Sequence, residues 1–118
     1  MINDLPFIQK MKKVQHKLLE FLANESNLEE NYESFFNLLK DEKIDKDKKE
    51  FKAFLLLLTR ISENYFHNSF FIDKLKKILQ HYFALIQIYY SNLEIFHIFK
   101  DNKLILLFLI ENEILKIT

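Results

Sequence analysis

Residues 47–61 read DKKEFKAFLLLLTRI, and the spacing of their apolar side chains predicts a helix. Phe51, Phe54 and Leu58 recur at three- and four-residue steps, which places them on one helical face. Leu56 fills a position between them, so the segment is apolar on nearly every side. Helices of this kind are usually buried. We therefore expect this helix to be central in the fold rather than peripheral.

The absence of glycine limits the folds that this chain can form. The 118 residues include no glycine and a single proline, Pro6. Glycine is the usual residue where the backbone needs a positive φ, as in tight β-hairpins and phosphate-binding loops. A chain without it favours helices joined by polar turns. We predict an all-α fold of about six helices, arranged as an antiparallel bundle or as a short solenoid of helical hairpins.

Helix start signals and apolar spacing predict where these helices lie. Capping boxes, in which a serine and a glutamate satisfy free backbone amides reciprocally, occur at residues 26–29 and 91–94. We expect one unbroken helix over residues 70–90, the longest of the chain, although residues 86–90 could pass for a short strand. The predicted helices span about residues 5–23, 28–39, 47–61, 70–90, 92–99 and 104–110, within a single domain over residues 1–118.

Charge and cysteine content exclude several classes of protein. Seventeen basic residues balance seventeen acidic ones, whereas nucleic-acid binders normally carry a basic excess or a basic stripe. The chain has no cysteine, so disulfides, thiolate nucleophiles and zinc–thiolate sites are impossible. No apolar run approaches the roughly 20 residues that span a bilayer, and the first residues do not resemble a secretory signal. We expect a cytoplasmic protein that binds no nucleic acid.

The titratable residues show no arrangement typical of catalysis. The four histidines include no pair at the i, i+4 spacing that lets two imidazoles hold one metal ion. We expect the acidic pairs, among them Glu29 with Glu30 and Glu111 with Glu113, at helix starts and turns, where solvated carboxylates stabilise the helix dipole. General acid–base catalysis needs a carboxylate held in an apolar pocket. We therefore expect no catalytic, metal-binding or cofactor-binding residue, and hence a protein that is not an enzyme.

Aromatic side chains are abundant, with 13 phenylalanines and 5 tyrosines. Several of them are adjacent in sequence, and a helix cannot point both members of such a pair at one core. Aromatic surface left over would suit a protein partner. The alternative is that the packed helices cover every ring. The candidate partner surface, which combines aromatic residues with the apolar C-terminal end, comprises Tyr89, Tyr90, Phe108, Ile114, Leu115 and Ile117.

Four runs of sequence resemble a known family. Residues 31–44 read NYESFFNLLKDEKI, residues 50–55 read EFKAFL, residues 60–64 read RISEN and residues 91–111 read SNLEIFHIFKDNKLILLFLIE. In this order they resemble the helical leader of the large ankyrin-repeat families of trichomonad protists, over about residues 15–118. The resemblance implies a role in protein–protein scaffolding. The chain contains no Thr-Pro-Leu-His phrase and no glycine turn, so it holds no ankyrin repeat, and it stands either alone or as part of a longer protein.

These observations favour a non-enzymatic protein–protein interaction or scaffold module. One alternative is a helical bundle of structural role that self-associates as a homodimer. A second alternative is attachment to a membrane surface through an amphipathic N-terminal helix, whose lysines would meet anionic lipid. The apolar stripe of that helix is ordinary for a helix that packs on a core, so we rank membrane attachment below the other two.

Overall fold

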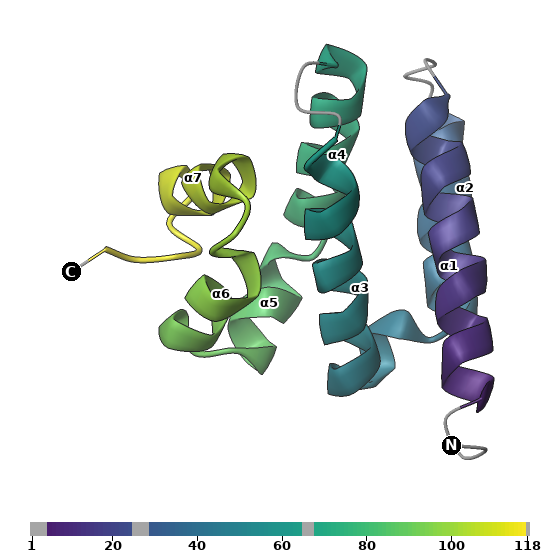
Figure 1. Cartoon of the computed structure of the whole chain (residues 1–118), viewed down its shortest axis with the longest axis horizontal. Coiled ribbons are helices and arrows are strands. Elements are labelled where there is room, and N and C mark those ends of the chain that lie inside the picture. The colour runs from purple at the N-terminus through teal and green to yellow at the C-terminus, as the bar shows by residue number, and fades with distance from the viewer. Residues whose placement is uncertain (1–4, 25–28, 65–67, 118) are drawn as a thin grey trace. The chain divides into compact units, whose positions relative to one another are not determined.

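The computed structural model describes residues 5–24, 29–64 and 68–117. Within these ranges the chain forms seven α-helices and one 3-10 turn and contains no strand, which confirms the predicted all-α fold (Figure 1). We predicted one domain, and the spatial contacts group the residues into two units, Met1–Phe54 and Leu55–Thr118. The boundary between the units falls inside α3 (Lys48–Ser62).

The first unit contains an antiparallel helical hairpin. Its elements are α1 (Leu5–Ala23), α2 (Glu29–Asp41), the 3-10 turn η2 (Ile44–Lys46) and the beginning of α3. In Figure 1, α1 and α2 lie alongside each other and run in opposite directions. The rings of Phe21 and Phe35 stack between the two helices, with centroids 4.5 Å apart and planes inclined by 2°. The buried apolar side chains of this unit are Val14, Leu18, Phe21, Leu22, Tyr32, Phe35, Leu39, Ile44, Phe51 and Phe54.

Polar contacts attach the start of α3 to α1. Asp47 caps α3, because its Oδ1 accepts hydrogen bonds from the backbone amides of Lys49 at 2.8 Å and Glu50 at 3.1 Å. The Glu50 carboxylate reaches Lys10 of α1, with Oε1 and Nζ 2.7 Å apart. The predicted start of this helix near residue 47 is therefore confirmed, and its N-terminal glutamate serves a contact between helices.

The second unit contains four complete helices after the end of α3. They are α4 (Ser69–His81), α5 (Phe83–Tyr89), α6 (Asn92–Phe99) and α7 (Lys103–Glu111). The predicted capping box at residues 91–94 is present in full, with both of its hydrogen bonds formed. The other predicted box includes residues 26–28, which lie outside the described residues.

The predicted unbroken helix over residues 70–90 is wrong. The backbone leaves the α-helical region at Tyr82, with φ −107° and ψ 9°, and this residue separates α4 from α5. The Tyr82 carbonyl oxygen then accepts the first hydrogen bond of α5, from the Ile86 amide at 2.9 Å. No proline or glycine marks the break, and both Tyr82 and Ile86 are buried. Packing in this unit therefore overrides the continuous helical pattern of the sequence. Residues 86–89 are helical, as predicted.

Candidate functional site

The described residues contain no group of three or more His, Cys, Asp or Glu side chains that could hold a metal ion. Several acidic residues instead serve the fold: Glu42 pairs with Lys13, and Asp47 caps α3. His67 lies outside the described residues. None of the helices in the described ranges has the length and apolar character that crossing a membrane requires. Among the described residues, each unit has a hollow on its surface that is a candidate for a site.

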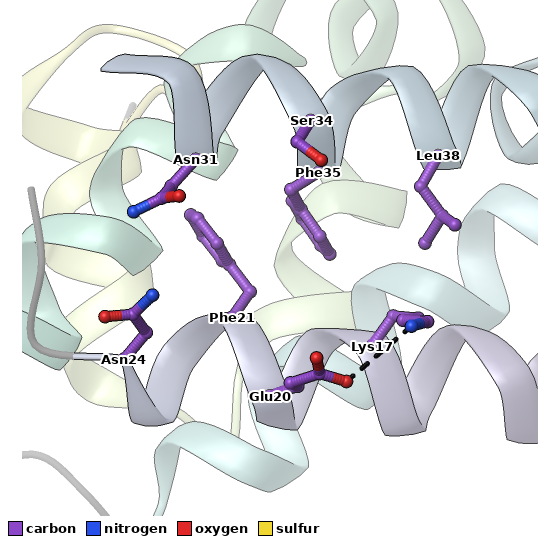
Figure 2. Close-up of a pocket in the computed structure, with 8 residues that line it drawn as sticks. All are labelled: Lys17, Glu20, Phe21, Asn24, Asn31, Ser34, Phe35 and Leu38. Carbon is purple, nitrogen blue, oxygen red and sulfur yellow. Dashed lines mark ion pairs between the residues drawn. The ribbon is translucent and has the colours of Figure 1, made fainter. Parts of the chain in front are cut away.

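The hollow in the first unit is a small, mostly polar notch of about 230 Å³ between α1 and α2. Figure 2 shows Phe21 pointing from α1 towards α2, with Asn24 and Asn31 at one end of the notch and Leu38 at the other. Lys17 pairs with Glu20 at its edge, with Nζ and Oε2 3.7 Å apart. Phe21 and Phe35, whose rings stack, also line the notch. Because its aromatic rings stack on each other and Lys17 and Glu20 pair with each other, the notch has the features of an ordinary contact between two packed helices.

The hollow in the second unit is a larger apolar groove of about 520 Å³, which we call the α6–α7 groove. It is formed by side chains from α6, from α7 and from the tail, residues 114–117, that follows α7. Helical spacing explains how each helix contributes: Leu93 and Phe96 are three residues apart, and Leu106 and Ile110 are four apart. The full lining is Asn92, Leu93, Phe96, Leu106, Ile110, Leu115, Lys116 and Ile117.

A sharp turn after α7 brings the tail back to the groove. Glu113 adopts a left-handed conformation with φ 61°, which ends the helix. The Ile114 amide then donates to the carbonyl oxygen of Leu109 at 2.9 Å, the bond that characterises a Schellman motif. In consequence Ile114 and Leu115 are buried.

The Asn92 side chain fixes the tail beside the start of α6. Its Nδ2 donates to the main-chain oxygen of Lys116 at 2.9 Å, and its Oδ1 accepts from the Lys116 amide at 2.7 Å. The primary amide thus pairs with both backbone groups of a single residue, which we call the Asn92 clamp. This clamp holds the backbone of Lys116 beside α6, and Lys116 and Ile117 both line the groove.

Large hydrophobic side chains in this groove remain open to solvent. The exposed fractions are 65% for Leu93, 41% for Phe96 and 75% for Ile117. Leu106 and Ile110 are half-buried beside them. Exposed apolar residues scattered singly are normal on a protein surface, but a contiguous group is characteristic of an interaction site.

The predicted partner surface of six residues does not form one exposed patch, because most of its residues are buried. Tyr90, Phe108, Ile114 and Leu115 are buried, and Tyr89 is half-buried. Phe108 is covered within its own unit, because the Phe83 ring lies 5.7 Å from it and Lys76 Nζ lies 5.4 Å above it. Two of the six, Leu115 and Ile117, line the α6–α7 groove.

Sequence reasoning missed most of the groove. The spacing of Leu93 and Phe96 is ordinary for a short helix, and Leu106 and Ile110 belong to a helical run that is apolar throughout. A signal was present in α7, because seven consecutive apolar residues at 104–110 cannot all face one core. The contribution of Asn92 had no local signal, since its partner is 24 residues away.

The chain matches no family model, no curated protein and no solved structure among those compared with it.

Proposed function

We propose that this chain is a non-enzymatic protein-interaction module and that the α6–α7 groove is its docking surface. The observation that carries the proposal is the gathering of Leu93, Phe96 and Ile117, all exposed, in one groove. Water in contact with these side chains would be released when a partner covers them, which favours association. The expected occupant is a helix of another protein that lays its apolar face into the groove.

The chemistry of the groove supports binding rather than catalysis. Its lining combines aliphatic and aromatic side chains with one amide and one ammonium group, and it includes no carboxylate, imidazole or hydroxyl side chain. General acid–base and nucleophilic mechanisms use those missing groups. The side-chain amide of Asn92 is already occupied by the clamp.

The resemblance to the helical leader of ankyrin-repeat families supports the same class of function. On this proposal the chain acts within a scaffold, where binding another protein is the activity that matters. No binding residue is transferred from that family, because the resemblance concerns the order of segments. The groove residues therefore come from the geometry of this chain alone.

A selection experiment tests the proposal. A display library of amphipathic helices would be selected on the full chain, with counter-selection on the double variant Leu93→Asp/Phe96→Asp. We expect selected peptides to bind the double variant at least about tenfold more weakly, because loss of a hot-spot side chain at the centre of an interface costs about 2 kcal/mol or more. Ile88→Asp is the matched control, since Ile88 is 75% exposed and lies on α5, outside the groove lining.

Two results would contradict the proposal. The first is that every selected peptide binds the wild-type chain and the double variant equally. The second is a concentration-dependent dimer in light scattering that the double variant abolishes, which would show that a second copy of the chain occupies the groove.

A further inference from the structure

The tail offers side chains, and not its backbone, to a partner at Lys116. Both backbone groups of this residue are used by the Asn92 clamp, at 2.9 Å and 2.7 Å. A partner strand would need such backbone groups to be free in order to pair with the tail by main-chain hydrogen bonds. Recognition at this point of the groove therefore depends on the apolar side chains and on the Lys116 ammonium group.

Lys116 places one positive charge on the edge of the apolar groove. Its side chain is exposed, and the two hydrogen bonds of the clamp fix the backbone that carries it. No carboxylate lies within ion-pairing distance of its Nζ in the described part of the chain, and none lines the groove. A cation held beside an apolar surface complements an anion on the ligand.

Exposure of the lining favours a macromolecule over a small ligand. Pockets for small molecules enclose most of the ligand surface, typically about 70–90%. Leu93 and Ile117 are 65% and 75% exposed, so the groove is too open for such enclosure. A protein segment that spans α6, α7 and the tail can cover these side chains together.

Charge also disfavours a symmetric pair of grooves. In a twofold homodimer each copy presents the same patch, so the groove of one chain would face the groove of the other. Each patch carries Lys116 and lacks a carboxylate, which would bring like charges together. An acidic segment from a different protein avoids this repulsion.

We propose that the α6–α7 groove binds an amphipathic helix that carries an acidic residue beside its apolar face, and that this residue pairs with Lys116. The proposal rests on the protein-binding function proposed above and specifies the partner. The apolar face of the helix covers Leu93, Phe96 and Ile117, while its carboxylate lies at the tail. The Asn92 clamp fixes the backbone position from which the Lys116 side chain extends.

The same kind of library tests the charge preference separately from binding. Its apolar positions would be fixed and the flanking positions randomised among Glu, Gln and Lys, with selection on the wild-type chain and on Lys116→Glu. We expect wild type to enrich Glu at one flanking position and Lys116→Glu to enrich Lys there. For one selected peptide, exchanging that Glu for Lys should weaken binding to wild type roughly two- to fivefold, as exposed ion pairs do.

Controls separate this proposal from the more general one. Lys12→Glu changes the net charge equally at an exposed site on α1 and should leave the Glu preference intact. The acidic partner would be overturned if wild type and Lys116→Glu enriched the same flanking residues. The docking groove would stand in that case if Leu93→Asp/Phe96→Asp still lost binding. If every groove variant keeps both the Glu preference and the binding of the wild-type chain, the acidic partner and the docking groove are both overturned.

Discussion

Asn102 donates a hydrogen bond from its side-chain Nδ2 to the main-chain oxygen of Thr59 in α3, with 3.2 Å between the two atoms. The same nitrogen donates to the Ser62 hydroxyl oxygen, which in turn donates to the Thr59 oxygen at 3.0 Å. The Asn102 Oδ1 accepts from the Ile105 amide at 3.0 Å, so one side chain both caps α7 and binds the end of α3. All three polar side chains are buried.

Replacing Asn102 should therefore destabilise the second unit strongly. We expect Asn102→Ala to lower the free energy of unfolding by about 2–4 kcal/mol, because it takes the acceptor from the Ile105 amide and the shared donor from the Thr59 oxygen and the Ser62 hydroxyl. Asn102→Asp should keep the cap but lose both donated bonds and bury a charge, so it should not restore stability. Urea unfolding followed by circular dichroism measures both effects.

The matched control is Asn37→Ala, at an exposed position within α2. Alanine is the better helix former there, so this variant should be neutral or slightly stabilised. Equal stability of Asn102→Ala and the wild-type chain would contradict the structural role of the buried network.

Features of the fold that depend on residues close together in the sequence were predictable, whereas features that depend on residues far apart were not. The start of α3 after Asp47 and the Ser91–Glu94 box followed from residues within one turn of each other. The break at Tyr82 did not, because it carries no proline or glycine and is imposed by tertiary packing.

The candidate site was less predictable than the helices for the same reason. Apolar character located the C-terminal region as a surface of interest, but could not say which side chains the turn at Glu113 would bury. Ile114 and Leu115 became buried, whereas Ile117 three residues beyond Ile114 stayed exposed. The clamp joins Asn92 to Lys116 across 24 residues, and such a pairing has no periodicity to reveal it.

Removing the Asn92 clamp should release the tail without unfolding the unit. In Asn92→Ala we expect the Lys116 amide to lose its protection from hydrogen exchange, since its acceptor is gone. The global free energy of unfolding should fall by only about 0.5–1.5 kcal/mol, the usual net value of such bonds. Site-resolved hydrogen exchange makes the measurement.

Asn112→Ala provides the comparison, because the Asn112 side chain bonds to the Phe108 oxygen at 2.8 Å and not to the tail. Protection at Lys116 should be unchanged in this variant. If Lys116 is equally protected in Asn92→Ala, the clamp does not hold the tail.

The turn after α7 contains strain that glycine would relieve. Glu113 has φ 61°, a region in which a side chain with a Cβ is penalised by about 1–2 kcal/mol. Glu113→Gly removes this penalty but gains flexibility in the unfolded chain, so we expect a net stabilisation of up to about 1 kcal/mol. Thermal unfolding provides the measurement. Glu113→Ala keeps the Cβ and should show no comparable gain, so equal midpoints for the two variants would refute strain as the cause.

Tyr90 should make stability fall at alkaline pH. Burial, followed by the nearby Tyr89 and Glu94, raises the pKa of the Tyr90 phenol from 10.0 to about 12. The folded chain therefore holds the phenolic proton more tightly than the unfolded chain does. Below pH 10 the phenol is protonated in both states and does not lower the free energy of unfolding. Between pH 10 and about 12 it ionises readily only in the unfolded state, so the free energy of unfolding decreases.

Tyr90→Phe removes this ionisation and leaves a ring of similar size. We expect the urea midpoint of the variant to fall less than that of wild type between pH 9.5 and 11.5, a window chosen to cover the rise from about 10 to about 12. Loss of charge from the lysines occurs in both proteins and cancels in the difference between them. Parallel declines of the two midpoints would show that the Tyr90 phenol ionises as easily in the folded chain as in the unfolded one.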